Sequence, residues 1–207
     1  MCIRDRTKRS AQSQRLCNSQ VGLRAESVNI TSLSNLERQL AETDAHIVFV
    51  QELAADAERC VEASHSFRRL GWKSVWAASF KTTKGGFSSG VAILARAHLD
   101  FWGEAGNEHI ARGRILCACV RAGGPGLVRL YSCYFVCGIG FVGKNLVFAS
   151  RLVAHVAKHG QPYIAGGDFN MDPEELRDGL PLRAIHGKSL PVKTATRAER
   201  RSGPLAA

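Results

Sequence analysis

The chain has 207 residues, of which 45% are hydrophobic, and its formal net charge is +10 at pH 7. This length suits one domain with a substantial core and leaves little room for two. No stretch approaches the roughly 18 apolar residues of a membrane-spanning helix, and the charged N-terminus lacks a secretory signal, so we expect no membrane span and an intracellular location, the nucleus included.

The positive charge lies at the two ends of the chain. Six basic residues stand against one acidic residue in residues 1–24, and the same ratio recurs in residues 183–207. Because basic ends are often solvated tails, charge alone does not establish a polyanionic partner. We expect a disordered lead-in over residues 1–24, the folded domain over residues 25–182 and an irregular basic segment over residues 183–207.

The first half of the domain predicts strands around one helix. "SVNITSL" begins as a strand, Leu33, Leu36 and Leu40 recur at helical spacing, and "HIVFV" is a buried strand. This order is typical of a βαβ unit. "GWKSVWAASF" and "SSGVAILAR" then predict two strands around the glycine-rich turn "KTTKGGF".

The second half continues with an antiparallel pair, a helix and a strand. "RGRILCACVRA" and "GLVRLYSCYFV" predict strands joined at "GGPG", and "PYIAGG" predicts another strand. "KNLVFASRLVAHVAKHG" predicts a helix that ends at Gly160. Its expected buried side comprises Leu146, Ala149, Leu152, Val153 and Val156. The simplest assembly is an α/β fold of mixed sheets with helices outside them.

The seven cysteines are scattered and stand mostly in apolar strand-like runs, where cysteine behaves as a small hydrophobe. Cys117 and Cys119 are two positions apart, so both could face the same side of a strand. We found no second pair of cysteines or histidines at ligand spacing to accompany them, and therefore expect no zinc site.

Polar side chains follow several of the predicted strands. Asp168 comes directly after "PYIAGG", at the sheet edge where α/β proteins tend to bind ligands, and Asn170 can point the same way. Glu52 follows "HIVFV", and Asn29 stands between the first strand and its helix. An Asx turn, a solvated glutamate and a helix-entry asparagine are the structural alternatives, but three converging strand ends favour a site.

Other polar residues have a structural interpretation or two open ones. In "NMDPEEL", Asp172 precedes Pro173 and Glu175 follows three residues later, which is typical of a capped helix start. Alternation along "LVRLYSCYFV" places Tyr134 on one face of its strand and Tyr131 on the other. One tyrosine could face a site, although a strand tyrosine more often belongs to the core.

Five elements in this order carry a resemblance to a known family. Asn29, "VQE" with Glu52, "GGFSSGVAIL", Tyr134 and "GGDFN" resemble the endonuclease/exonuclease/phosphatase superfamily. Its members include apurinic/apyrimidinic endonucleases, deoxyribonucleases and retroelement endonucleases. The resemblance covers residues 25–182. It implies a four-layer α/β sandwich with two mixed β-sheets flanked by helices, its last strands missing, and metal-dependent hydrolysis of phosphate esters.

The resemblance also implies a role for each site residue. Glu52 would bind Mg²⁺, or Mn²⁺ in its place, and Asn29 would support the metal or the phosphate. Asp168 would deprotonate the attacking water, while Asn170 would hold the scissile phosphate. Tyr134 would stabilise the growing negative charge on that phosphate. Tyr131 is the second candidate for this last role, because a register slip of one residue exchanges the two faces.

The sequence departs from the family pattern after Asn170. The family continues with an aspartate on a late strand and an Asp-His pair, and the residues that follow here match neither. We interpret His186 as an exposed loop histidine, and Thr194 and Thr196 as marking the approach to the absent part. We therefore expect an incomplete domain with weak activity, since one lost transition-state donor costs about a hundred- to a thousandfold in rate.

"GGDFNMDPEEL" and the basic C-terminal segment are more similar to the nuclease branches of the family than to its other branches. The expected substrate is thus the phosphodiester backbone of a nucleic acid. Two alternatives stay open. One is a non-catalytic remnant or binding module of the same fold, and the other is a phosphatase or phospholipase acting on inositol phosphates or sphingomyelin. The sequence does not indicate an oligomeric state.

Overall fold

The computed structural model describes residues 23–30, 32–83, 85–104, 108–121 and 126–179. The expected basic segment at residues 183–207 lies outside the described residues, with His186, Thr194 and Thr196, and so does nearly all of the expected lead-in. Within the described residues, no helix is long and apolar enough to cross a membrane.

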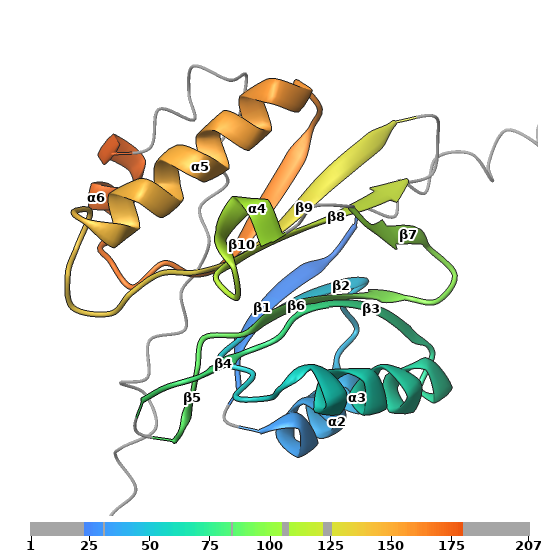
Figure 1. The fold of residues 1–207 in the computed structure, drawn as a ribbon. Helices are drawn as coiled ribbons and strands as arrows, with labels where there is room; N and C mark the ends of the chain where they lie inside the picture. The colour runs from blue at the N-terminus through green and yellow to red at the C-terminus, as the bar shows by residue number, and fades with distance from the viewer. Residues whose placement is uncertain (1–22, 31, 84, 105–107, 122–125, 180–207) are drawn as a thin grey trace, which may run out of the picture.

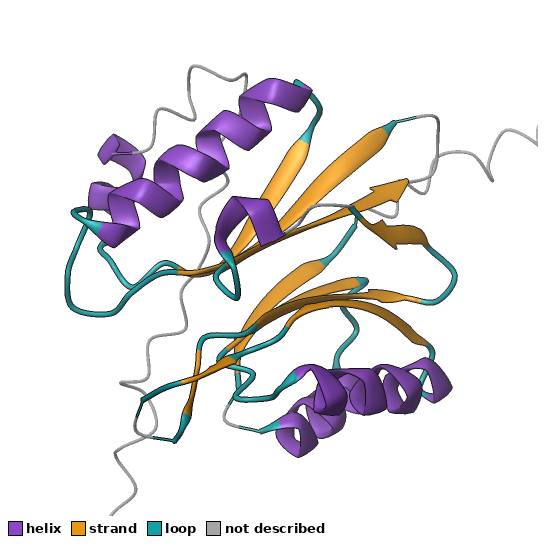
Figure 2. Ribbon diagram, viewed as in Figure 1, coloured by secondary structure: helices purple, strands orange, loops and turns teal. Residues whose placement is uncertain are grey.

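Two β-sheets lie face to face, and helices cover both outer faces (Figures 1 and 2). The first sheet has the order β1 (Ala25–Asn29), β2 (Ile47–Gln51), β6 (Val91–Arg96), β3 (Trp72–Ala77). The second has the order β10 (Tyr163–Asp168), β9 (Leu127–Tyr134), β8 (Ile115–Arg121), β7 (Asp100–Gly103). A short hairpin, β4 (Phe80–Lys81) with β5 (Phe87–Ser88), extends from the first sheet.

The helices complete four layers, as the sequence predicts. The first sheet carries α2 (Leu33–Glu42) and α3 (Ala57–Arg69), whereas the second carries α4 (Glu108–Ala111), α5 (Lys144–His159) and α6 (Pro173–Gly179) (Figure 1). Both sheets are mixed, because each contains one parallel pair beside antiparallel pairs. The four-layer α/β sandwich is therefore confirmed.

The parallel pairs decide where the polar strand ends lie. β1 pairs with β2 so that Asn29 stands beside Gln51, and β9 pairs with β10 so that Tyr134 stands beside Asp168. In each pair a helix, α2 or α5, returns the chain across the outer face of the sheet (Figure 1). Parallel neighbours end at the same edge, so each sheet presents two carboxyl ends together.

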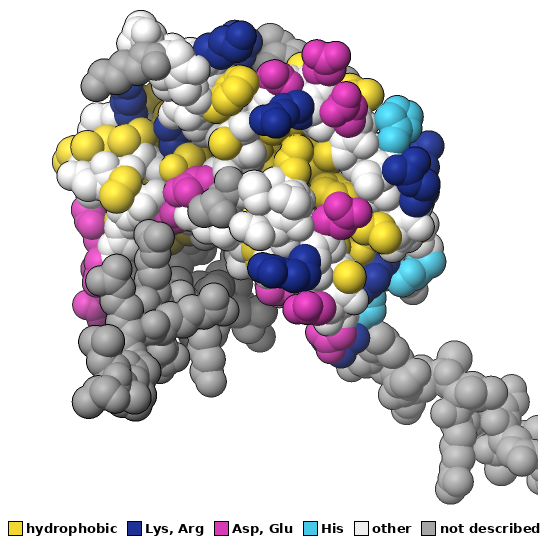
Figure 3. Space-filling model, turned by 90° about the horizontal axis from the view of Figure 1, so that it is seen from below, with side chains coloured by type: hydrophobic (Ala, Val, Ile, Leu, Met, Phe, Trp, Pro, Cys, Tyr) yellow, Lys and Arg dark blue, Asp and Glu magenta, His cyan; other side chains and the backbone are white. Residues whose placement is uncertain are grey.

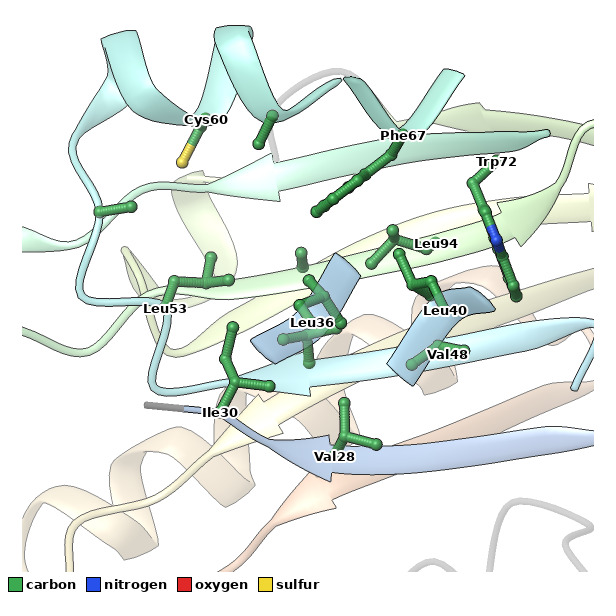
Figure 4. Packing of buried hydrophobic residues seen from close by; sticks show 14 of the residues in the cluster. Val28, Ile30, Leu36, Leu40, Val48, Leu53, Cys60, Phe67, Trp72 and Leu94 are labelled. Atoms are coloured by element: carbon green, nitrogen blue, oxygen red, sulfur yellow. The ribbon is translucent and has the colours of Figure 1, made fainter. Parts of the chain in front are cut away.

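Three apolar clusters fill the spaces between the four layers. Between the sheets lie Ile47, Phe49, Ile93, Leu116, Val120 and Leu130, among others. Beneath α2 and α3, Leu36, Leu40 and Phe67 pack against the first sheet (Figure 4). Beneath α5, Ala149, Leu152 and Val156 pack against the second sheet. Because β2 is covered on both faces, all five of its residues are buried, which explains its unbroken apolar sequence.

Two local predictions are wrong. Leu146 was expected on the buried side of α5, but 47% of its surface is exposed, because the buried stripe begins at Asn145, one helical step of about 100° away. The buried Asn145 side chain accepts a hydrogen bond from the Val136 backbone N–H at 2.8 Å and donates to the Gly140 carbonyl at 2.9 Å. A polar anchor thus takes the position predicted for an apolar contact.

The start of α6 is capped, but by Asp172 alone. Its Oδ1 accepts the backbone N–H of Glu174 at 2.8 Å, with Pro173 as the first helical residue. Glu175 does not complete the predicted capping box, since its Oε1 accepts the backbone N–H of Phe141 at 2.7 Å. The glutamate therefore ties α6 to the loop before α5, a partner that no local pattern indicates.

Gly167 is required for the close packing of β10 on β9. A Cβ added there would overlap the backbone carbonyl of Cys133, its partner in the sheet. We expect Gly167→Ala to lower the free energy of unfolding by about 2–3 kcal/mol, since inserted volume displaces packed backbone. Urea denaturation measures this change. Gly86→Ala is the control, because the nearest atom to its added Cβ is 3.7 Å away. Equal stabilities of the two variants would contradict the packing explanation.

Candidate active site

Four polar side chains from four strand ends meet at one edge of the two sheets. Asn29 ends β1 and Glu52 follows β2 in the first sheet, while Tyr134 ends β9 and Asp168 ends β10 in the second. Asn29 Nδ2 donates a hydrogen bond to Asp168 Oδ2 at 3.2 Å, and the Tyr134 hydroxyl donates to Glu52 Oε1 at 3.0 Å. Both bonds cross from one sheet to the other, so the structure brings these predicted residues together.

A polar chain beneath these residues, buried at Gln51 and Ser132, holds the sheets in register. The Ser27 hydroxyl donates to Gln51 Oε1 at 3.1 Å, and Gln51 Nε2 donates to Ser132 Oγ at 3.1 Å across the sheets. The Ser132 hydroxyl in turn donates to the Val50 carbonyl at 3.1 Å. Buried donors and acceptors are costly to leave unpaired, so this chain favours one relative position of β2 and β9.

The structure decides between the two tyrosines. Tyr134 is half-buried and reaches the site, whereas Tyr131 is fully buried on the opposite face of β9, beneath α5. The Tyr131 hydroxyl lies 3.0 Å from His155 Nδ1 on α5, and so it faces away from Glu52 and Asp168. The structure therefore places Tyr134, and not Tyr131, with the other predicted site residues.

Asn170 shapes the turn that follows Asp168. Its backbone N–H donates to Asp168 Oδ1 at 3.1 Å, so the Asx turn considered for Asp168 exists beside the contact with Asn29. The Asn170 side-chain Nδ2 donates to the Phe135 carbonyl at 2.9 Å, which leaves one of its two amide protons for another acceptor. The same side chain that was predicted to hold a phosphate thus also joins the ends of β9 and β10.

The backbone is strained at two of the site residues. Glu52 has φ of 59° and Asn170 has φ of 51°, both in the left-handed region. Asparagine tolerates this region, but a glutamate there costs on the order of 1–2 kcal/mol. Strain of this kind collects at functional sites because the surrounding structure must enforce it.

The site raises the pKa values of Asp168 and Tyr134. Burial raises the pKa of Asp168 above its ordinary value, the negative charge of Glu52 raises it further, and hydrogen bonds from Asn170 oppose the shift. Burial and the hydrogen bond to Glu52 raise the pKa of Tyr134 to about 12. The phenol is therefore a neutral hydrogen-bond donor at physiological pH, and Asp168 is a stronger base than an exposed aspartate.

Arg114 adds a cation that sequence reasoning missed. Its guanidinium carbon lies 4.5 Å above the centre of the Tyr134 ring, and its Nη1 donates to the Tyr134 carbonyl at 3.4 Å. Burial lowers the pKa of Arg114, but the nearby Tyr134 and Glu52 oppose this shift. The sequence signal for this contact is a basic residue just before β8. Because β8 pairs antiparallel with β9, the start of β8 lies next to the end of β9.

The oxygen atoms of the site fit a hard divalent cation. Among the described residues, the hydrogen bonds of Glu52 and Asn29 use Oε1 and Nδ2, which leaves Glu52 Oε2 and Asn29 Oδ1 as acceptors. Carboxylate and amide oxygens are the ligands that Mg²⁺ takes, usually together with water and substrate oxygens. A cation would also relieve the repulsion between Glu52 and Asp168 that raises the pKa of Asp168.

Carboxylate, amide and phenol side chains thus meet at the joined strand ends of a four-layer α/β sandwich. The chain belongs to the Endonuclease/Exonuclease/phosphatase family, whose sequence profile matches residues 18–187. A search among curated proteins finds no match.

Several solved structures are similar to this chain. The 3′ phosphatase NExo from Neisseria, bound to product DNA hairpin, is 20% identical with a TM-score of 0.49, and the match covers 73% of this chain and 59% of that one. AP endonuclease LMAP from Leishmania major is 15% identical with a TM-score of 0.48, covering 69% and 53%. The human Nocturnin catalytic domain is 15% identical with a TM-score of 0.48, covering 69% and 58%. The chain thus spans a little over half the length of these proteins.

The raised pKa of Asp168 predicts a pH-dependent stability cost. Its protonated form is favoured in the folded state, so the stabilising contribution is complete below the ordinary aspartate pKa of about 3.9 and is lost as the pH rises through the folded-state pKa. We expect Asp168→Asn, which cannot ionise, to unfold at a higher urea concentration than the wild type at pH 7, with no such gain at pH 3.

The control for this prediction is Asp100→Asn, which removes an exposed aspartate paired with Arg121 at 2.8 Å. Exposed ion pairs contribute little, so this variant should show no gain at pH 7. An Asp168→Asn protein that is less stable than the wild type at pH 7 would show that hydrogen bonds to the carboxylate outweigh its burial and the repulsion from Glu52.

Proposed function

We propose that this protein is a Mg²⁺-dependent phosphodiesterase that cleaves the backbone of a nucleic acid. The observation that carries the proposal is the pair of hydrogen bonds, Asn29 to Asp168 and Tyr134 to Glu52, that joins four strand ends into one group. A base, a neutral donor and hard oxygen ligands in one place are the groups that hydrolysis of a phosphate ester needs.

Each residue has a defined part in this proposal. Asp168 accepts the proton of the attacking water, and its two hydrogen-bonded oxygens fix the direction of that transfer. Tyr134 shifts its single hydroxyl proton from Glu52 to a phosphate oxygen as negative charge grows there, and its raised pKa keeps that proton on the phenol. The remaining Asn170 amide proton would donate to a second phosphate oxygen. Held by Glu52 and Asn29, Mg²⁺ would supply neutralisation of the phosphate charge.

The preference for a nucleic acid rests on charge at the site rather than on a basic surface. Over α2 and α3, basic and acidic side chains are interspersed (Figure 3). Arg114 stands beside Tyr134, at the end of β9 where the phosphate would lie. The net charge of +10 comes from the two ends of the chain, since the residues between them have no net charge. Contacts with flanking phosphates would therefore involve Arg114 and these ends.

The first functional prediction concerns cleavage. In Mg²⁺, the full-length protein should cut a labelled DNA or RNA strand, and Asp168→Asn should lower the rate about a hundred- to a thousandfold because no base of matching strength replaces it. Single-turnover kinetics on a denaturing gel measures the rate. Asp100→Asn is the matched control and should cleave like the wild type. Undiminished cleavage by Asp168→Asn would remove this residue from the mechanism.

The second functional prediction distinguishes the substrate classes. If a nucleic acid is the partner, the logarithm of the binding constant falls linearly with the logarithm of salt concentration, and Arg114→Ala reduces the slope by about one phosphate contact. Fluorescence anisotropy with a labelled oligonucleotide in Ca²⁺ measures this. A flat salt response would count against the proposal. Hydrolysis of inositol phosphates or sphingomyelin instead would assign a phosphatase or phospholipase, and binding without any hydrolysis would assign a non-catalytic module.

A further inference from the structure

A second cluster of polar side chains lies at the other end of the second sheet. His155 and His159, four residues apart on α5, and Glu104, directly after β7, bring their ligand atoms within 4.8 Å of one another. Arg129, which contacts Glu104, precedes Tyr134 on β9 by about 17 Å at roughly 3.3 Å per residue. The cluster is therefore separate from the candidate active site.

We propose that Glu104, His155 and His159 form a binding site for a divalent transition-metal ion such as Zn²⁺, with water as the fourth ligand. Glu104 Oε1 lies 3.6 Å from His159 Nε2, and Glu104 Oε2 lies 3.9 Å from His155 Nε2. Ligand atoms at about 2.0–2.1 Å from a tetrahedral ion are about 3.3–3.4 Å from one another. Small side-chain movements therefore suffice to enclose the ion.

Two features prepare the ligands for such an ion. The Tyr131 hydroxyl lies 3.0 Å from His155 Nδ1, where it can accept the Nδ1 proton and leave the Nε2 lone pair facing Glu104. His159 is the last residue of α5, and the helix C-terminus favours a cation nearby.

Arg129 holds the same groups in the absence of a metal. Its buried guanidinium donates to Glu104, to His159 Nδ1 at 2.9 Å and to Gln161 Oε1 at 2.8 Å. Because a guanidinium only donates, His159 Nδ1 accepts and its proton stands on Nε2, toward Glu104. When the ion binds, this proton moves from Nε2 to Nδ1, and Arg129 releases His159 while keeping Glu104 and Gln161. Arg129 thus competes with the metal.

The chemistry of the ligands indicates the class of metal and the role of the site. Imidazole nitrogens favour Zn²⁺, Co²⁺, Ni²⁺ or Cu²⁺ over Mg²⁺ and Ca²⁺, which take oxygen ligands. The ligands come from the end of α5 and from the residue after the edge strand β7. A bound ion would clamp this helix to the far edge of the sheet, and its first effect is therefore on stability.

The test is a Co²⁺ titration of the purified full chain, monitored by visible absorption. Tetrahedral Co²⁺ with nitrogen ligands absorbs strongly, whereas Co²⁺ held by carboxylates and water in octahedral geometry absorbs weakly. We expect the strong bands in the wild type, displacement of Co²⁺ by Zn²⁺, and a rise in Tm with Zn²⁺. His155→Ala and His159→Ala should each weaken binding at least a hundredfold and abolish the rise in Tm.

Two further variants separate the proposal from its alternatives. Glu52→Gln alters the candidate active site and should leave the strong Co²⁺ bands unchanged; loss of the bands in this variant would place the ion there instead. Arg129→Gln should tighten binding, because it removes the competing cation, and circular dichroism checks that it folds. No strong bands in the wild type at millimolar Co²⁺, or bands that persist in His159→Ala, would overturn the proposal.

Discussion

The structure depends on polar contacts that cross between the two sheets at one edge. The apolar cluster between the sheets would tolerate some sliding, since apolar packing is not directional. The hydrogen bond from Gln51 to Ser132 allows little, because any shift leaves two buried polar groups unpaired, at about 1–3 kcal/mol each. Glu52 follows Gln51 directly, and Tyr134 stands two residues after Ser132 on the same face of β9. The hydrogen bond between Gln51 and Ser132 therefore fixes the relative positions of Glu52 and Tyr134.

Two features at the edge of the sheets that carries the candidate active site lower the stability of the fold. Glu52 is held at a left-handed φ of 59°, and Asp168 is half-buried near a second negative charge that raises its pKa. Neither feature improves packing, and both persist because the joined strand ends enforce them. The fold makes Asp168 a stronger base than a free aspartate and keeps Tyr134 protonated beside it. Such an arrangement lowers stability, and it is therefore expected where it serves chemistry.

Most of the fold followed from periodicity, and the errors share a physical cause. The alternation along β9 correctly separated Tyr134 from Tyr131, because successive side chains of a strand point to opposite faces. α3 was not predicted, since its buried side holds only Cys60, Ala63 and Phe67 among charged residues. The partners of Arg114 and Glu175 come from distant segments, and the spacing of His155 and His159 was overlooked because Glu104 lies on another element. Local pattern predicts elements and faces, but long-range register decides contacts.

The period of two along β9 also keeps two kinds of chemistry apart. Ser132 and Tyr134 point between the sheets, toward the candidate active site, while Arg129 and Tyr131 point toward α5 and the cluster around Glu104. A well-ordered strand cannot exchange these faces without a register slip, which would bury Arg129 among apolar side chains and unpair Ser132. If both proposals hold, the oxygen ligands between the sheets and the imidazole ligands beneath α5 would select different metal ions. One strand can therefore support a site for catalysis and a separate site for stability, without either ion competing for the other's ligands.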